Sequence, residues 1–179
     1  MAAVFSTMFH AFLRLGEVTA SPHNIQFNQV ALESSSVAIT FSSFKHHQGP
    51  PITLSIQASA SENCCLVKLL KSYLTKRGST PGPLFCFPGN LPIQPARFRS
   101  LLSYAIARAN LASLYITPHS FRIGAATFAT TQGLSSSQIQ AMGRWRSNAF
   151  QKLLRIATIT VPHYSLLLIV AHNIAYVHG

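Results

Sequence analysis

The sequence predicts a mainly helical α+β domain with a small three-stranded antiparallel sheet in its N-terminal third. Two observations carry this prediction. Apolar residues recur at helical spacing before residue 16 and again after residue 63, whereas between Ile25 and Ile56 they alternate with a period of two. The chain has 179 residues and is 48% hydrophobic, which is enough for a single core.

The N-terminal third is predicted to hold one helix and three strands. The helix covers residues 2–15 and can end at Gly16. The sequence HHQGP at 46–50 reads as a hairpin connection between the last two strands, with proline limiting pairing at its edge. The apolar positions of the three strands are Ile25 and Phe27; Val37, Ile39 and Phe41; and Ile52, Leu54 and Ile56.

The remainder of the chain is predicted to be helical, with loops at its glycines and prolines. Thr117 can cap a helix that has Pro118 at its first position and ends near Gly133. Ser135 and Ser147 can cap the two short helices that follow. The predicted helices cover 63–77, 95–111, 118–133, 136–142 and 148–155.

The charge balance restricts the function. The chain has 14 lysines and arginines against 3 acidic residues, which gives a net charge of +11 and a pI near 10.4. Glycosidases and aspartic proteases need paired carboxylates, and EF-hands and two-metal nucleases need carboxylate clusters, so none of these classes fits. A strongly basic surface instead favours a polyanion, because binding to phosphates releases counterions.

No metal or cofactor is predicted. Cys64, Cys65 and Cys86 form no CxxC motif and are most simply reduced thiols of the core. His46 and His47 are adjacent, but no further ligand cluster accompanies them.

No membrane segment is predicted either. The N-terminus is apolar but lacks the basic residues that begin a signal peptide. Residues 156–179 carry no Lys, Arg, Asp or Glu, yet the apolar run at 165–177 is shorter than the roughly 20 residues that a bilayer requires.

One group of residues suggests chemistry. His119 and Arg122 are three positions apart at a predicted helix start, so they share a face where the helix dipole favours an anion. Two further cations could converge with them: Arg14, in the motif LRLGE at the end of the first predicted helix, and Lys45, at the tip of the predicted hairpin. Downstream, Gly143 and Arg144 precede Trp145, the only tryptophan of the chain.

This order of residues resembles the catalytic domain of tyrosine recombinases, and it is similar in detail to the versions carried by Crypton and DIRS-like mobile elements. Arg14 matches the family's first arginine in Leu-Arg-x-x-Glu, and Lys45 matches its hairpin lysine. His119 and Arg122 match His-x-x-Arg, and Trp145 matches the His/Trp position. The likeness covers roughly residues 1–157, and the stretch from Thr117 to Trp145 is its most specific part.

The resemblance implies a chemistry for these residues. Arg14 and Arg122 would grip the non-bridging oxygens of one DNA phosphate and stabilise the pentavalent transition state. Lys45 would protonate the departing 5′ oxygen, His119 would hydrogen-bond the phosphate, and Trp145 would support it. In the family a tyrosine then attacks phosphorus to form a 3′-phosphotyrosine link without a metal.

The match fails at the nucleophile. The position where the family carries this tyrosine is Leu153 here, and leucine has no nucleophilic atom. Tyr164, the next tyrosine, would reach the phosphate only after a rearrangement of the C-terminal segment. The sequence also shows no match to the family's DNA-clamping domain, and residues 158–179 match nothing in it. We therefore expect a truncated, degenerate or repurposed domain at 1–157, followed by an apolar tail of unknown role.

Three hypotheses remain open at this stage. The chain binds DNA as a recombinase-type domain that is inactive in cis, it is a non-enzymatic DNA-binding module, or it is an inert fragment of a decayed mobile element. DNA is the predicted partner, and the resemblance implies assembly of several copies on DNA and, in a eukaryote, a nuclear location. Candidate contacts to the DNA backbone are Arg97, Arg99, Arg108, Arg144 and Arg146.

Overall fold

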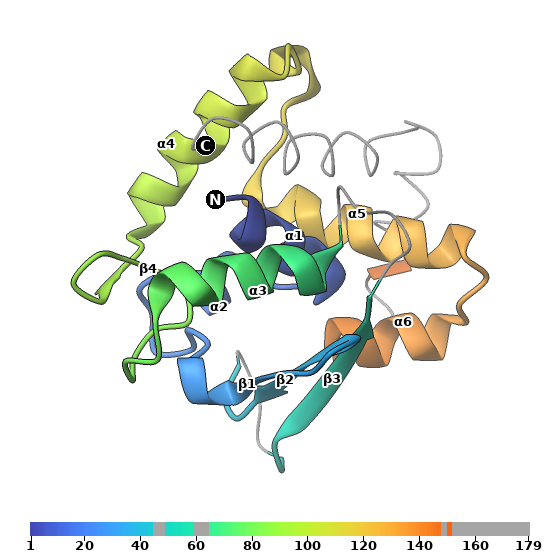
Figure 1. The fold of residues 1–179 in the computed structure, drawn as a ribbon. Coiled ribbons are helices and arrows are strands. Elements are labelled where there is room, and N and C mark those ends of the chain that lie inside the picture. Colours follow the sequence, from blue (N-terminus) through green and yellow to red (C-terminus); the bar gives the residue numbers. More distant parts are fainter. Residues whose placement is uncertain (45–48, 59–64, 148–149, 152–179) are drawn as a thin grey trace.

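The computed structural model describes residues 1–44, 49–58, 65–147 and 150–151 (Figure 1). The three-stranded sheet lies at one side of the molecule and α4 at the other, with α1 between them (Figure 1). The helices are α1 (Ala2–His10), α2 (Leu15–Val18), α3 (Leu66–Arg77), α4 (Pro95–Arg108), α5 (Pro118–Thr131) and α6 (Ser136–Gly143). The strands are β1 (Val30–Leu32), β2 (Ser36–Phe41), β3 (Ile52–Gln57), β4 (Cys86–Phe87) and β5 (Leu91–Pro92).

The predicted antiparallel sheet is present, in the order β1-β2-β3. Val37, Ile39 and Phe41 of β2 are buried, as expected for alternate residues that face one core. The first strand is Val30–Leu32, so its prediction around Ile25 and Phe27 was wrong. Backbone groups of that segment bond to other loops: the Ile25 amide donates to the Glu17 carbonyl, and the Phe27 amide donates to the Gly82 carbonyl.

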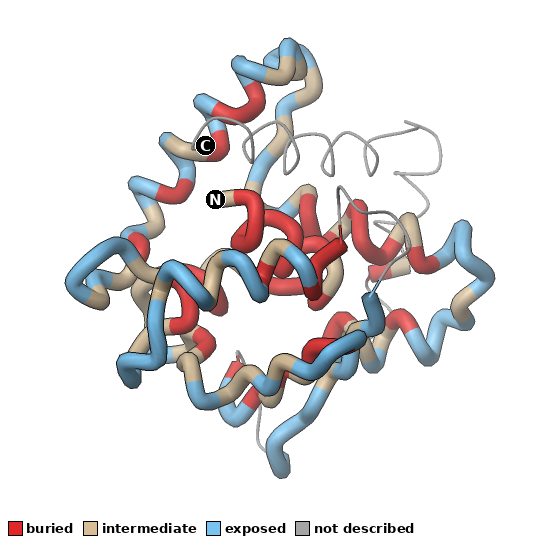
Figure 2. The backbone as a smooth tube through the Cα atoms, viewed as in Figure 1, coloured by how far each residue is buried: buried red, intermediate tan, exposed pale blue. Residues whose placement is uncertain are grey.

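Helix α1 lies in the middle of the core and contacts both α3 and α5. All of its residues from Ala2 to Phe9 are buried, including Ser6 and Thr7, whose hydroxyl groups bond within the helix (Figure 2). The Phe5 ring stacks on Phe121 of α5 at a centroid distance of 5.3 Å and meets Phe98 of α4 edge to face at 5.4 Å. Phe5 therefore joins three helices at one point.

Helix α1 ends at His10, earlier than the predicted end near Leu15. Phe12 takes a left-handed conformation with φ of 53°, and the Leu13 amide donates to the Met8 carbonyl at 2.9 Å. Together with the bond from the Phe12 amide to the Phe9 carbonyl, this is a Schellman motif. The chain turns there, and Arg14 becomes the N-cap residue of α2.

The predicted starts of the two helices that follow α4 are confirmed. Thr117 precedes α5 with Pro118 at the first helical position, and the side chain of Ser135 accepts a hydrogen bond from the Gln138 amide at 3.3 Å. Helix α6 ends in a second Schellman motif, in which Arg144 is left-handed with φ of 53° and the Trp145 amide donates to the Gln140 carbonyl. The predicted helix at 148–155 lies mostly outside the described residues.

The hairpin of β4 and β5 has no counterpart among the predicted elements. Cys65 is buried and Cys86 half-buried, both as free thiols, while Cys64 lies outside the described residues. Among the residues that the structure describes, no group of His, Cys, Asp or Glu could hold a metal ion. No helix within the same residues is both long and apolar enough to cross a bilayer.

Candidate functional site

A surface hollow of about 450 Å³ lies where α2, α4 and the start of α5 meet. Its polar lining comes from Arg14, Arg99, Thr117 and His119, and its apolar lining includes Leu13, Leu15 and Pro118. Two of the predicted phosphate-site residues, Arg14 and His119, thus meet in one hollow together with a cation that the resemblance did not assign to the site. No carboxylate lines the hollow within the described part of the chain.

Arg14 is fixed by its position at the start of α2. Its amide donates to Glu17 Oε2 at 2.7 Å, and its Nη1 lies 3.5 Å from Glu17 Oε1. Its Nη2 donates to the carbonyl oxygen of Arg144 at 3.4 Å. The side chain remains 29% exposed, so Arg14 is held at its base and side while part of it faces the hollow.

His119 stands in the first turn of α5 and is exposed. Partial burial lowers its pKa from the ordinary 6.5, and the positive charges of Arg122 and Arg14 lower it further. At neutral pH the imidazole is therefore mostly neutral, and an anion bound in the hollow would raise its pKa by countering those charges.

Arg122 follows His119 by three residues in α5 but does not line the hollow, and only 2% of the residue is exposed. Its Nη1 donates to the Phe12 carbonyl at 2.6 Å, and its Nη2 donates to the Gly143 carbonyl. Burial, with Arg14 and Arg144 nearby, lowers its pKa to about 9, while Glu17 acts in the opposite direction. The guanidinium stays charged at neutral pH, but in this structure two of its nitrogens are bonded to main-chain oxygens.

Trp145 forms a wall for Arg122. The Arg122 guanidinium lies over the indole at 4.1 Å from the ring centroid, a cation–π contact. The Phe150 ring stacks on the indole at a centroid distance of 5.0 Å, and the Phe12 ring meets the indole edge to face at 6.0 Å. Gly143 has no room for a side chain, because a Cβ atom there would collide with the indole.

Arg144 is buried, unlike the other arginines that were predicted to contact a DNA backbone. The sequence placed it among candidate contacts to a DNA backbone, but its side chain is only 1% exposed. Its Nη2 forms an ion pair with Glu17 at 3.0 Å, and Glu17 is itself 2% exposed. Burial lowers the pKa of Arg144, an effect that the Glu17 carboxylate opposes. A guanidinium enclosed in this way is not available to DNA.

The two buried arginines stabilise the C-terminal ends of two helices. Arg122 bonds the carbonyls of Phe12 and Gly143, and Arg144 bonds the carbonyls of Ala11 at 3.2 Å and Met142 at 3.3 Å. These oxygens belong to the ends of α1 and α6, where carbonyls lack helical partners and the helix dipole is negative. Glu17 and two helix ends thus offset a concentration of positive charge below the hollow.

The other predicted site residues do not join this group. Arg97, Arg108 and Arg146 are exposed, and none of them lines the hollow. Lys45 and Leu153, the predicted nucleophile position, lie outside the described residues, as does Tyr164. Motif reasoning missed the burial of Arg144, the link from Glu17 to two arginines, and the place of Arg99 in the hollow.

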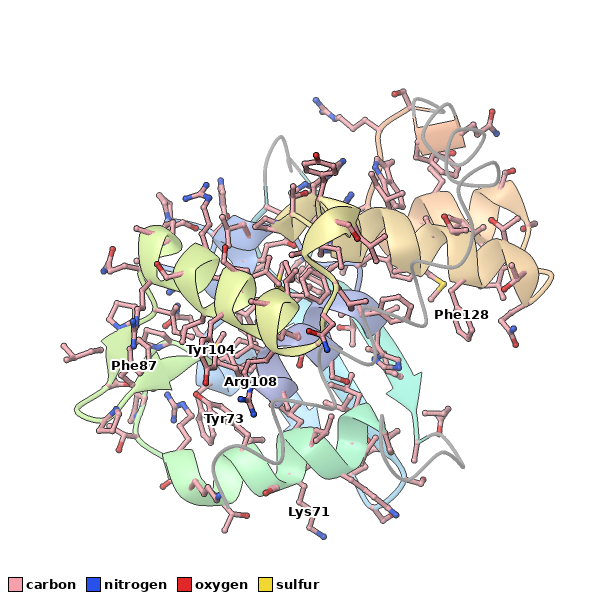
Figure 3. All side chains as sticks on the ribbon, turned by 90° about the horizontal axis from the view of Figure 1, so that it is seen from above. Lys71, Tyr73, Phe87, Tyr104, Arg108 and Phe128 are labelled. Carbon is pink, nitrogen blue, oxygen red and sulfur yellow. The ribbon has the colours of Figure 1, made fainter. Side chains whose placement is uncertain are left out.

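A second hollow, of about 530 Å³, lies between the end of α3 and the β4–β5 hairpin. Its lining includes Tyr73 and Phe87, which Figure 3 labels on these two elements. Burial raises the pKa of Tyr73 to about 12, and its hydroxyl donates to the Leu84 carbonyl and accepts from the Cys86 amide. Arg77, also in the lining, donates to the carbonyls of Pro83 and Thr80, so the polar groups here already bond to one another.

Lowering the pH from about 7 to about 5 is expected to destabilise the fold. Burial lowers the pKa of His10 from its ordinary 6.5, and the hydrogen bond with the Ser6 carbonyl opposes this only in part. The pKa of His119 is lowered in the same direction. The unfolded chain therefore binds protons that the folded chain resists, so the free energy of unfolding falls as the pH drops below 6.5. Urea unfolding of His10→Gln should show a weaker pH dependence than the wild type, and an unchanged dependence would contradict the assignment.

The fold matches solved structures of tyrosine recombinases, which confirms the predicted fold class. The XerH site-specific recombinase bound to difH in a pre-cleavage complex has a TM-score of 0.65 at 15% identity, over 88% of this chain and 44% of that one. The post-cleavage complex of XerH with palindromic difH gives 0.64 at 15%, with the same coverage of 88% and 44%. XerA recombinase gives 0.64 at 23%, over 89% of this chain and 57% of that one.

No protein-family model matches the chain, and no curated protein matches it. The chain spans about half the length of the solved recombinases that it matches. At 15% and 23% identity such a likeness establishes a shared fold, and function rests on the residues of the site.

Proposed function

We propose that this chain is a DNA-binding domain of the tyrosine recombinase type, and that its surface hollow takes one phosphate of the DNA backbone. The observation that carries the proposal is the meeting of Arg14, Arg99 and His119 in a hollow without a carboxylate in the described part of the chain. The recombinase fold and the net charge of +11 support it. The matched XerH structures are complexes with difH substrates, and DNA is by analogy the ligand proposed here.

Each group has a distinct part in binding. Arg14 and Arg99 reach the hollow from two different helices, so they can donate to different non-bridging oxygens of one phosphate. His119 donates a further hydrogen bond at the start of α5, where the helix dipole favours an anion. Arg122 contributes its charge from below, and gripping the phosphate directly would require it to exchange a carbonyl for a phosphate oxygen.

We further propose that the chain does not cleave DNA in cis. Leu153 occupies the position where the family carries its nucleophile. The tyrosines of the described part are Tyr73, Tyr104 and Tyr115, and none of them lines the hollow. The proposed function is therefore DNA binding related to site-specific recombination, with strand cleavage lost. Relatedness to Crypton and DIRS-like elements, an origin in a mobile element, and assembly on DNA belong to the same proposal, which the order of the motif residues supports.

The test compares two arginines of α4 that are both exposed. Arg99 lines the hollow, whereas Arg97 does not. Arg99→Ala is expected to weaken binding to a short DNA duplex about tenfold and to reduce the salt dependence by about one counterion, since one phosphate contact is lost. Arg97→Ala should weaken binding about twofold or less. Fluorescence anisotropy over a series of salt concentrations measures both quantities.

The outcomes separate the competing hypotheses. Equal losses in the two variants would indicate a non-enzymatic module that binds through diffuse charge alone. No binding by a wild-type chain that unfolds cooperatively would overturn DNA binding altogether. The absence of any cooperative unfolding transition would favour an inert fragment.

A further inference from the structure

Arg144 contacts several parts of the structure around the hollow. Its guanidinium donates to the ends of α1 and α6 and to both carboxylate oxygens of Glu17, at 3.2 and 3.0 Å. The same group lies over the Phe41 ring at 3.8 Å and near the Phe44 ring at 5.6 Å. Residues 11–17 and 41–44, both distant from Arg144 in the sequence, therefore meet at its side chain.

Arg144 is linked in two ways to Arg14, which lines the hollow. Glu17 accepts hydrogen bonds from Arg144 and, through the same carboxylate, from the amide and Nη1 of Arg14. The carbonyl oxygen of Arg144 accepts a hydrogen bond from Arg14 Nη2. Arg144 is therefore connected to Arg14 in two ways, once through Glu17 and once through its own main-chain carbonyl.

The other two contacts lead to the end of the sheet. Phe41 is the last residue of β2, and Phe44 is the last described residue before the predicted general acid Lys45. The cation–π contact with Phe41 places this end of β2 against the turn after α6. One guanidinium thus relates the strand end to the helix that carries Arg14.

Stability alone is a weak reason for such an arrangement. Replacement of a buried ion pair by apolar residues of similar size is often neutral or stabilising. Arg144 also occupies a left-handed position that favours glycine, and its buried Nε has no hydrogen-bond partner. These features have a cost to the fold, whereas the contacts to Arg14 serve the hollow.

We propose that Arg144 is a positioning residue that acts through Glu17 and its own carbonyl to hold Arg14 in the hollow, with the end of β2 beside it. The inference rests on the proposed function for its purpose, but the positioning itself is a property of the free protein. It can therefore be tested with and without DNA.

The first test measures the pKa of His119 by NMR titration in the free protein. Arg14 lowers this pKa, and so does Arg122, while Arg99 lines the same hollow; Arg144 is not among the groups that affect His119 directly. If Arg144→Lys releases Arg14, the His119 pKa should rise by roughly half or more of the rise that Arg14→Gln causes. In the Arg14→Gln background, Arg144→Lys should add nothing. The control Lys71→Gln, on the exposed face of α3, should leave the pKa unchanged.

The second test measures DNA affinity in the wild type, Arg144→Lys, Arg14→Gln and the double variant. A double-mutant cycle should be strongly non-additive, because Arg144 acts on DNA only through Arg14. Additive losses, or a His119 pKa that ignores Arg144→Lys, would overturn the inference. If the wild type does not bind DNA, the proposed function fails, and the NMR titration still decides the positioning role.

A variant that does not fold is covered by a second one. Glu17→Gln combined with Arg144→Met removes both charges of the buried pair and leaves no unpaired carboxylate. It should fold and raise the His119 pKa in the same direction as Arg144→Lys. Loss of cooperative unfolding in both proteins would assign Arg144 to the stability of the fold and overturn the proposal.

Discussion

Replacement of Glu17 by alanine should lower the free energy of unfolding by about 3–5 kcal/mol, the usual cost of removing one partner from a buried ion pair. The side chains of Glu17 and Arg144 are 2% and 1% exposed, so the arginine would keep a buried charge without its carboxylate. Arg14 would lose the acceptor of its amide at the same time. Urea unfolding followed by circular dichroism measures the loss.

The matched control is Glu33→Ala. Glu33 is also a carboxylate in the N-terminal half, but it is exposed and accepts a hydrogen bond from Ser36 at the turn between β1 and β2. Its replacement should cost about 1 kcal/mol or less. Similar losses in the two variants would mean that the buried pair contributes nothing particular to the fold.

Replacement of Leu153 by tyrosine has the largest expected effect on function. The wild type should form no covalent product with DNA, because a hydrocarbon side chain stands at the proposed nucleophile position. Leu153→Tyr should form a protein–DNA adduct if the phosphate-binding groups are intact. A suicide DNA substrate, which traps the 3′-phosphotyrosine link, measures the adduct by its migration on a denaturing gel.

Two controls make this experiment decisive. Leu153→Phe adds an aromatic ring of similar size without the hydroxyl and should give no adduct. Arg14→Ala in the Leu153→Tyr background should abolish the adduct, because the phosphate loses a ligand in the hollow. An adduct of the wild type that maps to Tyr164 would refute the loss of the nucleophile. No adduct from a folded Leu153→Tyr protein would count against an intact site.

Much of the fold could be predicted because local signals agreed with the tertiary structure. Helices α5 and α6 begin where Thr117 and Ser135 can cap them, and β2 and β3 follow the alternation of their apolar residues. The errors arose where tertiary contacts decide. Ile25 and Phe27 alternate like a strand, but their backbone groups bond to loops that are distant in the sequence. The end of α1 depends on the left-handed conformation of Phe12, which is rare for phenylalanine and cannot be predicted from its presence in the sequence.

The sequence predicted several residues that the structure brings close together, but it did not predict which of them are buried. Motif order predicted Arg14, His119, Arg122 and Trp145 as site residues; in the structure Arg14 and His119 line the hollow and Trp145 packs on Arg122, while their roles stay a prediction. Sequence alone does not separate an exposed arginine from a buried one, so Arg144 was grouped with surface cations. Nor does it separate Arg97 from Arg99, because their directions depend on how Phe98 and Leu102 seat α4 on the core.

Carbonyls of Ala11, Phe12, Met142 and Gly143 accept hydrogen bonds from Arg122 and Arg144, in addition to the Glu17 carboxylate that pairs with Arg144. Every amino acid supplies such an oxygen, so a substitution at these positions leaves the four main-chain acceptors in place. Gly143 is restricted by the indole that fills its space, and Ala11 and Phe12 are restricted by their burial in the core. Chains that differ in side chain at such positions can therefore keep the same main-chain ligands for the two cations.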